Sequence, residues 1–282
     1  MRVRVKRRLH QAKLRFISVI KEIGRIFIYR QIGRSAAALS YYLTISVFPF
    51  LICASAILGS LHVYQSDVFE VLGDIMPTQA FSTITDFLKY ISNNSSELMF
   101  AIGLVAMLTS SSAAFRSFVG IMGELQGEMR FTGLRRGVFS FVFSLAFLAA
   151  VYISGLVLLS GNWLMQILET YIGFGEILTL WTWIRFVILF LLLFSVIYGM
   201  YSISAPRETK RTHRFPGALL ASVVLVVASI LYSRMISESL RYTLLYGSLA
   251  SFIILLIWLY TCSVILILGN VLNISLKKTD VE

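Results

Sequence analysis

Residues 249–268 read LASFIILLIWLYTCSVILIL, a run of twenty residues without a charged side chain. An α-helix rises about 1.5 Å per residue, so a run of this length matches the ~30 Å hydrocarbon core of a bilayer. The run does not alternate apolar with polar residues, as a transmembrane β-strand does. A helix satisfies its own backbone hydrogen bonds in lipid. The segment therefore predicts a transmembrane helix.

Five other segments share this character, and the composition agrees with them. Charged residues make up 14% of the chain and apolar residues 57%, against about 25% charged residues in a soluble domain. The six predicted spans are Ala37–Leu61, Leu98–Phe118, Gly137–Ser160, Thr182–Ser204, Pro216–Ile236 and Gly247–Gly269. We predict an all-α, polytopic membrane bundle over residues 35–275, with a basic arm before it (1–34) and a short tail after it (276–282).

Lys and Arg are distributed unequally between the two ends of these spans. Of the 25 basic residues, 21 fall in the arm, near or after the ends of the second and fourth spans, or in the tail. The remaining four, Lys89, Arg185, Arg234 and Arg241, fall on the opposite side. Cytoplasmic segments of membrane proteins carry the excess of Lys and Arg. We therefore predict that both termini are cytoplasmic.

The basic arm is predicted to contact the membrane surface. Four apolar residues at helical spacing share one face of it: Phe16, Ile20, Ile23 and Phe27. We interpret residues 10–32 as an amphipathic helix along the inner surface, whose Lys and Arg attract the anionic inner leaflet. The net charge of +11 is then explained by topology and lipid contact. Membrane lipids are the expected partners, no nucleic acid is expected, and the sequence identifies no protein partner.

The segment between the first two spans, residues 62–97, is long enough to hold structure of its own. Val68, Leu72 and Ile75 form one apolar stripe at helical spacing. A second stripe follows Pro77 and contains Phe81, Ile84, Leu88 and Ile91. We predict a helical hairpin on the outer face, which either caps the bundle or acts as a lid over an outward-facing cavity. The next outer segment, 161–181, is predicted to be a loop with tryptophans at the headgroup level.

Several short motifs occur in a distinctive order along the chain. They are ALSYY (38–42), SVFP (46–49), PGA (216–218), YGSLA (246–250), LIWLY (256–260) and GNVLN (269–273). Over residues 20–275 this set resembles the bacterial BrkB/YihY membrane proteins, for which an older label is ribonuclease BN-like. The resemblance implies a six-helix, multi-pass protein of the bacterial inner membrane and no defined reaction. Two positions depart from the family: Val271 replaces its usual glutamate, and its asparagine near the end of the second span is absent around Gly123. No role of that carboxylate is carried over.

The chain lacks the residue clusters that hydrolysis or ATP-driven pumping requires. Metal-dependent RNA cleavage needs grouped His, Asp or Glu ligands, but His10, His62 and His213 are scattered. The Gly-x-x-x-x-Gly-Lys-Ser/Thr phosphate-binding loop does not occur. We expect no enzymatic activity, no catalytic residue, no metal site and no cofactor, and nuclease activity is disfavoured.

Hydroxyl groups are frequent in the predicted spans, whereas Asp and Glu are absent from their central turns. The hydroxyls of the first span have two interpretations: hydrogen bonding within helices, including repair of the carbonyl that Pro49 leaves free, or lining of a polar cavity between spans one, two and six. Gly217 with Ala221 marks a close helix contact. Arg116, Arg185 and Arg234 are predicted near span ends, where their stems can reach the interface. The candidate cavity or headgroup contacts are Tyr41, Tyr42, Ser46, Pro49, Ser111, Arg116, Arg185, Arg234, Tyr246 and Asn273.

Two functions are compatible with these features. The first is transport or flipping of a lipid or other amphiphilic anion, because arginine pairs well with phosphate and hydroxyl-rich spans lie between the arginines. The alternative is a non-transporting scaffold for envelope assembly, in which the basic arm docks partners or lipid.

Overall fold

The computed structural model describes residues 18–19, 21–60, 97–127, 133–172, 176–206, 214–237 and 249–279. Residues 21–29 form a short helix. Six long helices follow: α2 (Ile32–Ser60), α5 (Glu97–Gln126), α6 (Gly133–Ile172), α7 (Glu176–Ser204), α8 (Phe215–Ser237) and α10 (Leu249–Thr279). Every regular element in these ranges is a helix, which confirms the predicted all-α class.

Five of the helices are long and apolar enough to cross a bilayer. The qualifying segments are Ala101–Gln126, Gly133–Ala150, Phe186–Ser204, Phe215–Tyr232 and Phe252–Lys277. The multi-pass helical character is thereby confirmed. α2 is a further helix of 29 residues that contains nearly all of the first predicted span. Its passage through the membrane, and with it the total of six spans and the cytoplasmic termini, stay predictions.

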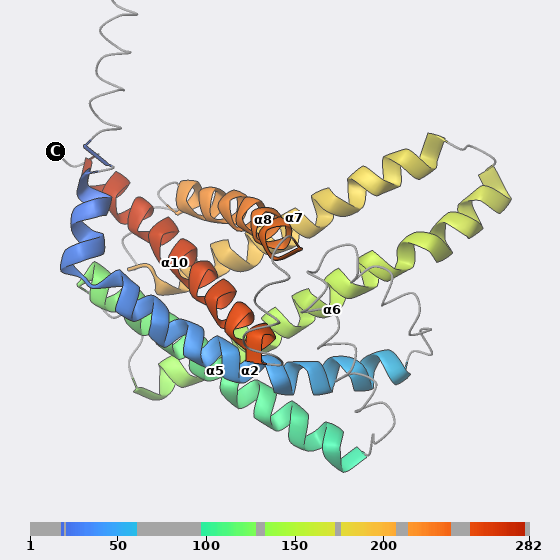
Figure 1. Ribbon diagram of the computed structural model, residues 1–282, viewed down its shortest axis with the longest axis horizontal. Coiled ribbons are helices and arrows are strands. Elements are labelled where there is room, and N and C mark those ends of the chain that lie inside the picture. Colours follow the sequence, from blue (N-terminus) through green and yellow to red (C-terminus); the bar gives the residue numbers. More distant parts are fainter. Residues whose placement is uncertain are drawn as a thin grey trace, which may run out of the picture.

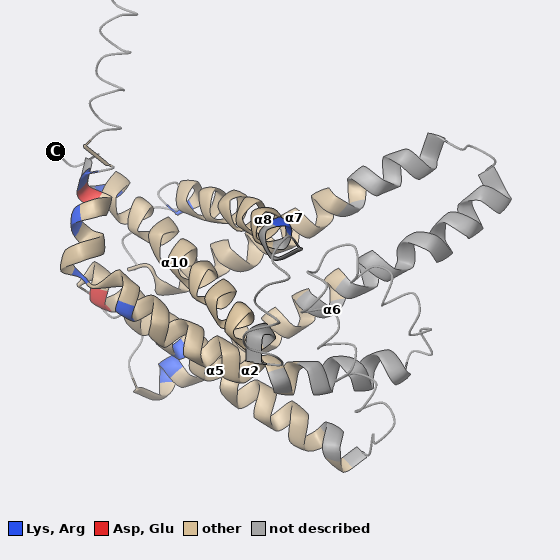
Figure 2. Cartoon of the chain, in the orientation of Figure 1, with Lys and Arg blue, Asp and Glu red and all other residues tan. Residues whose placement is uncertain are grey.

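The six long helices are arranged in a ring. Neighbours in contact are α2 with α5, α5 with α6, α6 with α7, α7 with α8, α8 with α10, and α10 with α2. α5 also contacts α7 and α10. The helices come together at the end where α5, α7 and α10 finish, and α6 and α7 extend away from α2 and α5 toward the other end (Figure 1). Most described Lys and Arg residues lie toward the first of these ends (Figure 2).

The buried core lies at the same end of the bundle. Phe118 of α5 stacks on Tyr201 of α7 with ring centroids 6.2 Å apart, and both side chains are fully buried. Around this pair are apolar residues of α2, α5, α7, α8 and α10, including Ala36, Met122, Ile197, Ala218, Ala221, Ile267 and Val271. By contrast, large apolar side chains of α6 and α8 are exposed, such as Val142, Leu220 and Val227. Surfaces of this kind suit lipid and are unfavourable in water.

The helix in the basic arm ends before the predicted residue 32, and residues 18–19 are helical as well. Helix 21–29 ends in a turn at Arg30 and Gln31, and α2 starts at Ile32. Gln31 has a φ of 49°, the left-handed conformation that commonly terminates a helix. The part of the predicted amphipathic helix before residue 18 lies outside the described residues. Ile23, predicted on the apolar face that contacts the membrane surface, instead packs on the core of the bundle together with Ile26, while Phe27 is exposed.

The predicted loop over 161–181 is wrong. α6 continues to Ile172 and α7 begins at Glu176. The stretch after Gly161 contains several good helix formers, so nothing in it stops the helix. At about 1.5 Å per residue, the 40 residues of α6 span roughly 60 Å, twice the hydrocarbon thickness. The predicted outer hairpin lies outside the described residues.

Candidate functional site

Two arginines meet where α5 and α6 pack together. Arg136, in the first turn of α6, donates from its Nη2 to the backbone carbonyl of Arg116 on α5. Gly120, one turn further along α5, provides the space for this contact. A Cβ atom at Gly120 would lie 3.1 Å from the Arg136 Cζ and would collide with its Nη2. The guanidinium of Arg136 therefore rests in a notch on the surface of α5.

The side chain of Arg116 extends back along its own helix. Its Nη1 donates to the Ser112 Oγ at 2.7 Å, the direction in which helical side chains normally lean. α5 continues ten residues beyond Arg116, to Gln126. Arg116 is therefore not in the last turns of its helix, as the predicted span ending at Phe118 implied. Its charge is directed toward the middle of α5 and away from the nearer helix end.

Neither arginine is neutralised by a neighbour in the described part of the chain. The guanidinium contacts of Arg116 and Arg136 are to a hydroxyl and a carbonyl, and neither forms an ion pair with a described carboxylate. Arg135, beside Arg136, is exposed and adds a third positive charge. The acidic residue on this stretch of α5, Glu124, lies eight residues beyond Arg116 and is also exposed. The local charge is therefore positive.

Buried hydroxyls continue from the arginines along α6. Ser140 and Ser144 follow Arg136 at intervals of four residues, so all three lie along one face of the helix. Ser140 is 3% exposed and Ser144 is 0% exposed. Among the described residues neither hydroxyl has a hydrogen-bond partner. We name the five residues Arg116, Arg136, Ser112, Ser140 and Ser144 the arginine seam.

Aromatic side chains surround the seam. Phe115 makes edge-to-face contacts with Phe143 at 4.8 Å and with Phe147 at 5.9 Å between ring centroids. Ser140 lines a cavity of about 10 Å³ with residues of α5, α6 and α7: Phe115, Phe118, Val119, Phe139, Phe143, Met200 and Ile203. This volume is about that of one water molecule. Phe139 and Phe147 are also partly exposed on the outer surface, so the seam borders an apolar face.

The candidate contacts predicted on α2 are engaged within that helix or lie on its surface. Tyr41 is 60% exposed and packs edge-to-face on Tyr42 at 5.5 Å. The Ser46 Oγ donates to the Leu43 carbonyl at 2.7 Å, and Thr44 donates to the Ser40 carbonyl at 2.7 Å. These contacts favour hydrogen bonding within the helix over a cavity. Neither hydroxyl donates to the carbonyl that Pro49 leaves without a partner, because both donate to carbonyls earlier in α2.

The remaining predicted contacts are spread over the bundle. Ser111 is buried on α5, five residues before Arg116. Arg234 is exposed in the last turn of α8. Arg185 lies on α7, but its side chain is outside the described residues, as is Tyr246. The structure thus brings Ser111 and Arg116 into one region of α5 and does not join them to Arg234.

Asn273 belongs to a second polar cluster, between α8 and α10. Its Oδ1 accepts a hydrogen bond from the Gly217 backbone N–H at 2.7 Å, and its Nδ2 donates to the Arg214 carbonyl at 3.1 Å. A Cβ atom at Gly269 would lie 2.8 Å from the Ala221 Cβ and 2.9 Å from the Gly217 carbonyl. The predicted close contact at Gly217 and Ala221 is therefore confirmed. Because both ends of its amide are engaged, Asn273 holds two helices together.

Of the five residues of the arginine seam, only Arg116 is among the contacts predicted from the sequence. Arg136, Ser140 and Ser144 follow one another at four-residue spacing in an otherwise apolar segment. This spacing places a cation and two hydroxyls on one face of a helix. The signal was present in the sequence, but the partner of that face, the notch at Gly120, became visible only from the packing of α5 on α6.

Comparison with known proteins places the chain in a family. The family model described as virulence factor BrkB matches residues 25–282. The putative ribonuclease-like protein YfkH of Bacillus subtilis is 25% identical over 93% of this chain and 96% of its own length. The UPF0761 membrane protein VV0203 of Vibrio vulnificus is 23% identical over 98% of this chain and 87% of its own length. No solved structure matches.

The family match covers all six long helices, the seam between α5 and α6, and the cluster that joins α8 to α10. The resemblance carried by the motifs at 38–49, 216–218 and 246–273 is thereby confirmed. With five helices able to cross a bilayer, this chain is an integral membrane protein of the BrkB family.

Proposed function

We propose that this protein moves an anionic amphiphile, such as an acidic phospholipid, across the bacterial inner membrane, and that the arginine seam receives its headgroup. The observation that carries the proposal is the meeting of Arg116 and Arg136 on neighbouring helices without a carboxylate partner among the described residues. The contact joins the Arg136 guanidinium to the Arg116 backbone, and the Arg116 guanidinium extends toward Ser112. Two guanidinium groups without a described carboxylate partner are costly to desolvate in a membrane-length bundle, and their positive charges add. A bound anion relieves this cost.

Phosphate is the anion that this arrangement suits best. The planar guanidinium presents several N–H donors in a fixed fork, which matches the oxygens of a phosphate group. Arg136 uses Nη2 on the Arg116 carbonyl and Arg116 uses Nη1 on Ser112, so each arginine retains further donors. The exposed Phe139 and Phe147 beside the seam provide an apolar surface for acyl chains. A lipid at the edge of the bundle could therefore place its headgroup in the seam and its acyl chains on this apolar face.

The buried hydroxyls give the headgroup a route beyond the arginines. Ser140 and Ser144 lie one and two helical turns after Arg136, and their hydroxyls lack described partners. An unpaired buried hydroxyl costs roughly 1–3 kcal/mol, so two of them along one face favour a polar guest. Opening of α6 against α5 would expose both hydroxyls to the headgroup. In this arrangement the basic end of the bundle faces the cytoplasm, in line with the general excess of Lys and Arg in cytoplasmic segments.

The proposal is tested with purified protein in vesicles that contain a fluorescent phosphatidylglycerol. Lipid that reaches the outer leaflet is bleached by a membrane-impermeant reductant, so the rate of bleaching gives the rate of translocation. We expect wild-type protein to exceed empty vesicles, and Arg136→Ala to lower the rate roughly tenfold, because an arginine–phosphate contact of about 1–2 kcal/mol is lost. Arg135→Ala removes the same charge from the adjacent exposed residue and should leave the rate within about twofold.

Two outcomes contradict the proposal. One is a wild-type rate equal to that of empty vesicles while the protein is folded, which would favour the scaffold function. The other is equal rates for Arg136→Ala and wild type.

The name of the B. subtilis relative suggests a second candidate activity, the cleavage of RNA. Within the described residues no group of three or more His, Cys, Asp or Glu side chains is placed to hold a metal ion, and we expect no cleavage of labelled RNA by the purified protein in the presence of Mg²⁺.

A further inference from the structure

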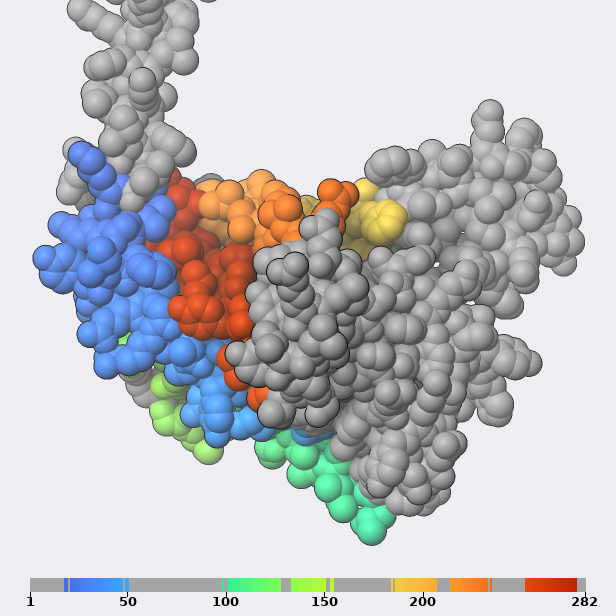
Figure 3. Space-filling view, in the orientation of Figure 1, coloured from blue at the N-terminus to red at the C-terminus, as the bar shows by residue number. Residues whose placement is uncertain are grey.

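The short helix 21–29 carries a second basic site, separate from the arginine seam. This helix lies at the edge of the described part of the molecule, beside α10 (Figure 3). Ile23 and Ile26 pack against the core, which fixes the helix on the bundle. A groove of about 350 Å³ lies along it, lined by Glu22, Arg25, Ile26, Tyr29 and Arg30. The described lining residues all come from this one helix, so the groove is a shallow, open surface site.

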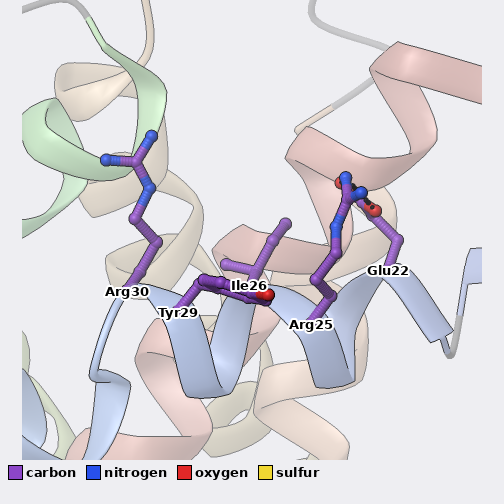
Figure 4. Close-up of a pocket in the computed structure, with 5 residues that line it drawn as sticks. All are labelled: Glu22, Arg25, Ile26, Tyr29 and Arg30. Atoms are coloured by element: carbon purple, nitrogen blue, oxygen red, sulfur yellow. Dashed lines mark hydrogen bonds and ion pairs between the residues drawn. The ribbon is translucent and has the colours of Figure 1, made fainter.

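The groove has a basic residue at each end. Arg25 and Arg30 project on the same side of the helix, with Ile26 between them (Figure 4). Arg25 pairs with Glu22 at 2.7 Å. The Arg30 guanidinium forms no hydrogen bond or ion pair with the rest of the described chain. Within the described ranges, the groove therefore combines an arginine that has no ion-pair partner, Arg30, with the Arg25–Glu22 ion pair. The carboxylate of that pair can accept a further hydrogen bond from a hydroxyl or amine.

An apolar surface adjoins the groove. Ile28 is 75% exposed, Tyr29 is 81% exposed, and Phe27 is also exposed. Ile28 and Tyr29 follow Arg25 by three and four residues and therefore lie beside it on the helix, whereas Phe27 lies on another side. Exposed apolar residues beside a membrane-spanning bundle are unfavourable in water and suit the boundary between headgroups and acyl chains. The side chains that would enter the acyl region thus lie next to the arginines that would remain at the headgroup level.

We propose that this groove binds the phosphodiester headgroup of an anionic phospholipid of the inner leaflet, with phosphatidylglycerol as the representative ligand. Arg30 and Arg25 contact the phosphate, Glu22 accepts a hydrogen bond from a glycerol hydroxyl, and Ile28 and Tyr29 lie against the acyl chains. The site holds a lipid at the rim of the bundle. It does not depend on the transport proposed above, because its residues and those of the arginine seam lie on different helices.

The test measures lipid binding to the intact protein by native mass spectrometry. Delipidated protein in detergent is titrated with phosphatidylglycerol and, separately, with phosphatidylcholine of the same chain length. We expect wild type to prefer phosphatidylglycerol and Arg30→Ala to weaken that binding roughly fivefold, as removal of one basic residue at a lipid surface does. Lys21→Ala is the matched control, since Lys21 lies on the same helix but does not line the groove. It should change binding less than twofold.

Three results would overturn the site. Equal affinity of wild type for the two lipids would show that the groove does not select an anionic headgroup. Equal losses in Arg30→Ala and Lys21→Ala would assign the binding to diffuse surface charge. Displacement of the lipid by millimolar glycerol 3-phosphate would show that the groove takes a free phosphate ester and that the acyl chains contribute nothing. Ile28→Ser supplies an independent readout: the proposal requires weaker binding of both lipids with the phosphatidylglycerol preference retained, and unchanged binding would contradict the apolar contact.

Discussion

The side-chain oxygen of Asn273, on α10, accepts a hydrogen bond from the backbone N–H of Gly217, in the first turn of α8, at 2.7 Å. The first N–H groups of a helix have no partner within it and are usually satisfied by a residue just before the helix. Here the partner comes from another helix, 56 residues further along the chain. The start of α8 is thus defined by a tertiary contact that also holds α10 in place.

Loss of the Asn273 amide should destabilise the bundle. Asn273→Ala leaves the Gly217 N–H and the Arg214 carbonyl without this partner. We expect a loss of about 1–2 kcal/mol, the range for buried polar contacts in membrane proteins, measured as a lower midpoint of thermal unfolding in detergent. Thr261→Ala removes a hydroxyl that donates only within α10, to Ile257, and should cost less than about 0.5 kcal/mol. Equal midpoints for Asn273→Ala and Thr261→Ala would refute the clamp.

The close approach of α8 and α10 should not tolerate one added methyl group. A Cβ atom at Gly217 would lie 2.6 Å from the Asn273 Cγ and would collide with the Gly269 carbonyl. Gly217→Ala should therefore cost about 1–3 kcal/mol through overpacking. Gly137→Ala meets nothing within 4 Å and should leave stability unchanged or raise it by up to about 1 kcal/mol. The two variants are compared by thermal unfolding, and a Gly217→Ala protein as stable as wild type would contradict the packing described here.

Gly120→Ala should affect translocation more than stability. The added Cβ atom would occupy the position of the Arg136 guanidinium. Because the Arg136 side chain is long and flexible, its guanidinium can move aside at a small cost in stability. Arg136 would then leave the Arg116 carbonyl. We expect the translocation rate to fall several-fold while the midpoint of unfolding changes by less than about 1 kcal/mol. A normal rate in a folded Gly120→Ala protein would show that the notch has no part in transport.

Ser144→Ala separates a structural from a functional role of the buried hydroxyl. Ser144 is 0% exposed, and its hydroxyl has no partner among the described residues. Replacement by alanine should therefore raise stability by up to about 1 kcal/mol while slowing translocation. Ser154→Ala, which loses only a bond to the Ala150 carbonyl of its own helix, is the control for both measurements. If Ser144→Ala translocates lipid at the wild-type rate, the hydroxyl lies off the path.

Hydropathy predicts the membrane-length helices well because lipid constrains each segment separately. The spans of α5, α6, α7, α8 and α10 follow from the length of their apolar runs, without reference to any neighbour. Helix ends are predicted less well. The positive φ of Gln31 ends helix 21–29 although glutamine is a good helix former, and α6 continues past Gly161 because nothing in the following residues stops it.

The candidate site is only partly visible in the sequence because its geometry depends on pairs of helices. The charge of Arg116 marks it as a candidate contact, but its contact with Arg136 depends on the absence of a side chain at Gly120. Asn273 belongs to the GNVLN motif, and the structure gives it a hydrogen-bond partner in the PGA motif at Gly217. Ser46 is a polar residue near Pro49, yet its hydroxyl donates to the Leu43 carbonyl within the same helix. The spacing of polar residues along one helix can be predicted from the sequence, whereas the fit between two helices cannot.

The most direct measurement compares two headgroups in the same vesicles. Wild-type protein is reconstituted with phosphatidylglycerol and phosphatidylcholine that carry distinguishable fluorophores, and their translocation rates are recorded together. An arginine seam that has no carboxylate partner among the described residues predicts that phosphatidylglycerol moves roughly tenfold faster. It also predicts that Arg116→Ala with Arg136→Ala brings the ratio close to one. Equal rates for the two lipids in wild type, or a preference that survives the loss of both arginines, would contradict the seam as the headgroup site.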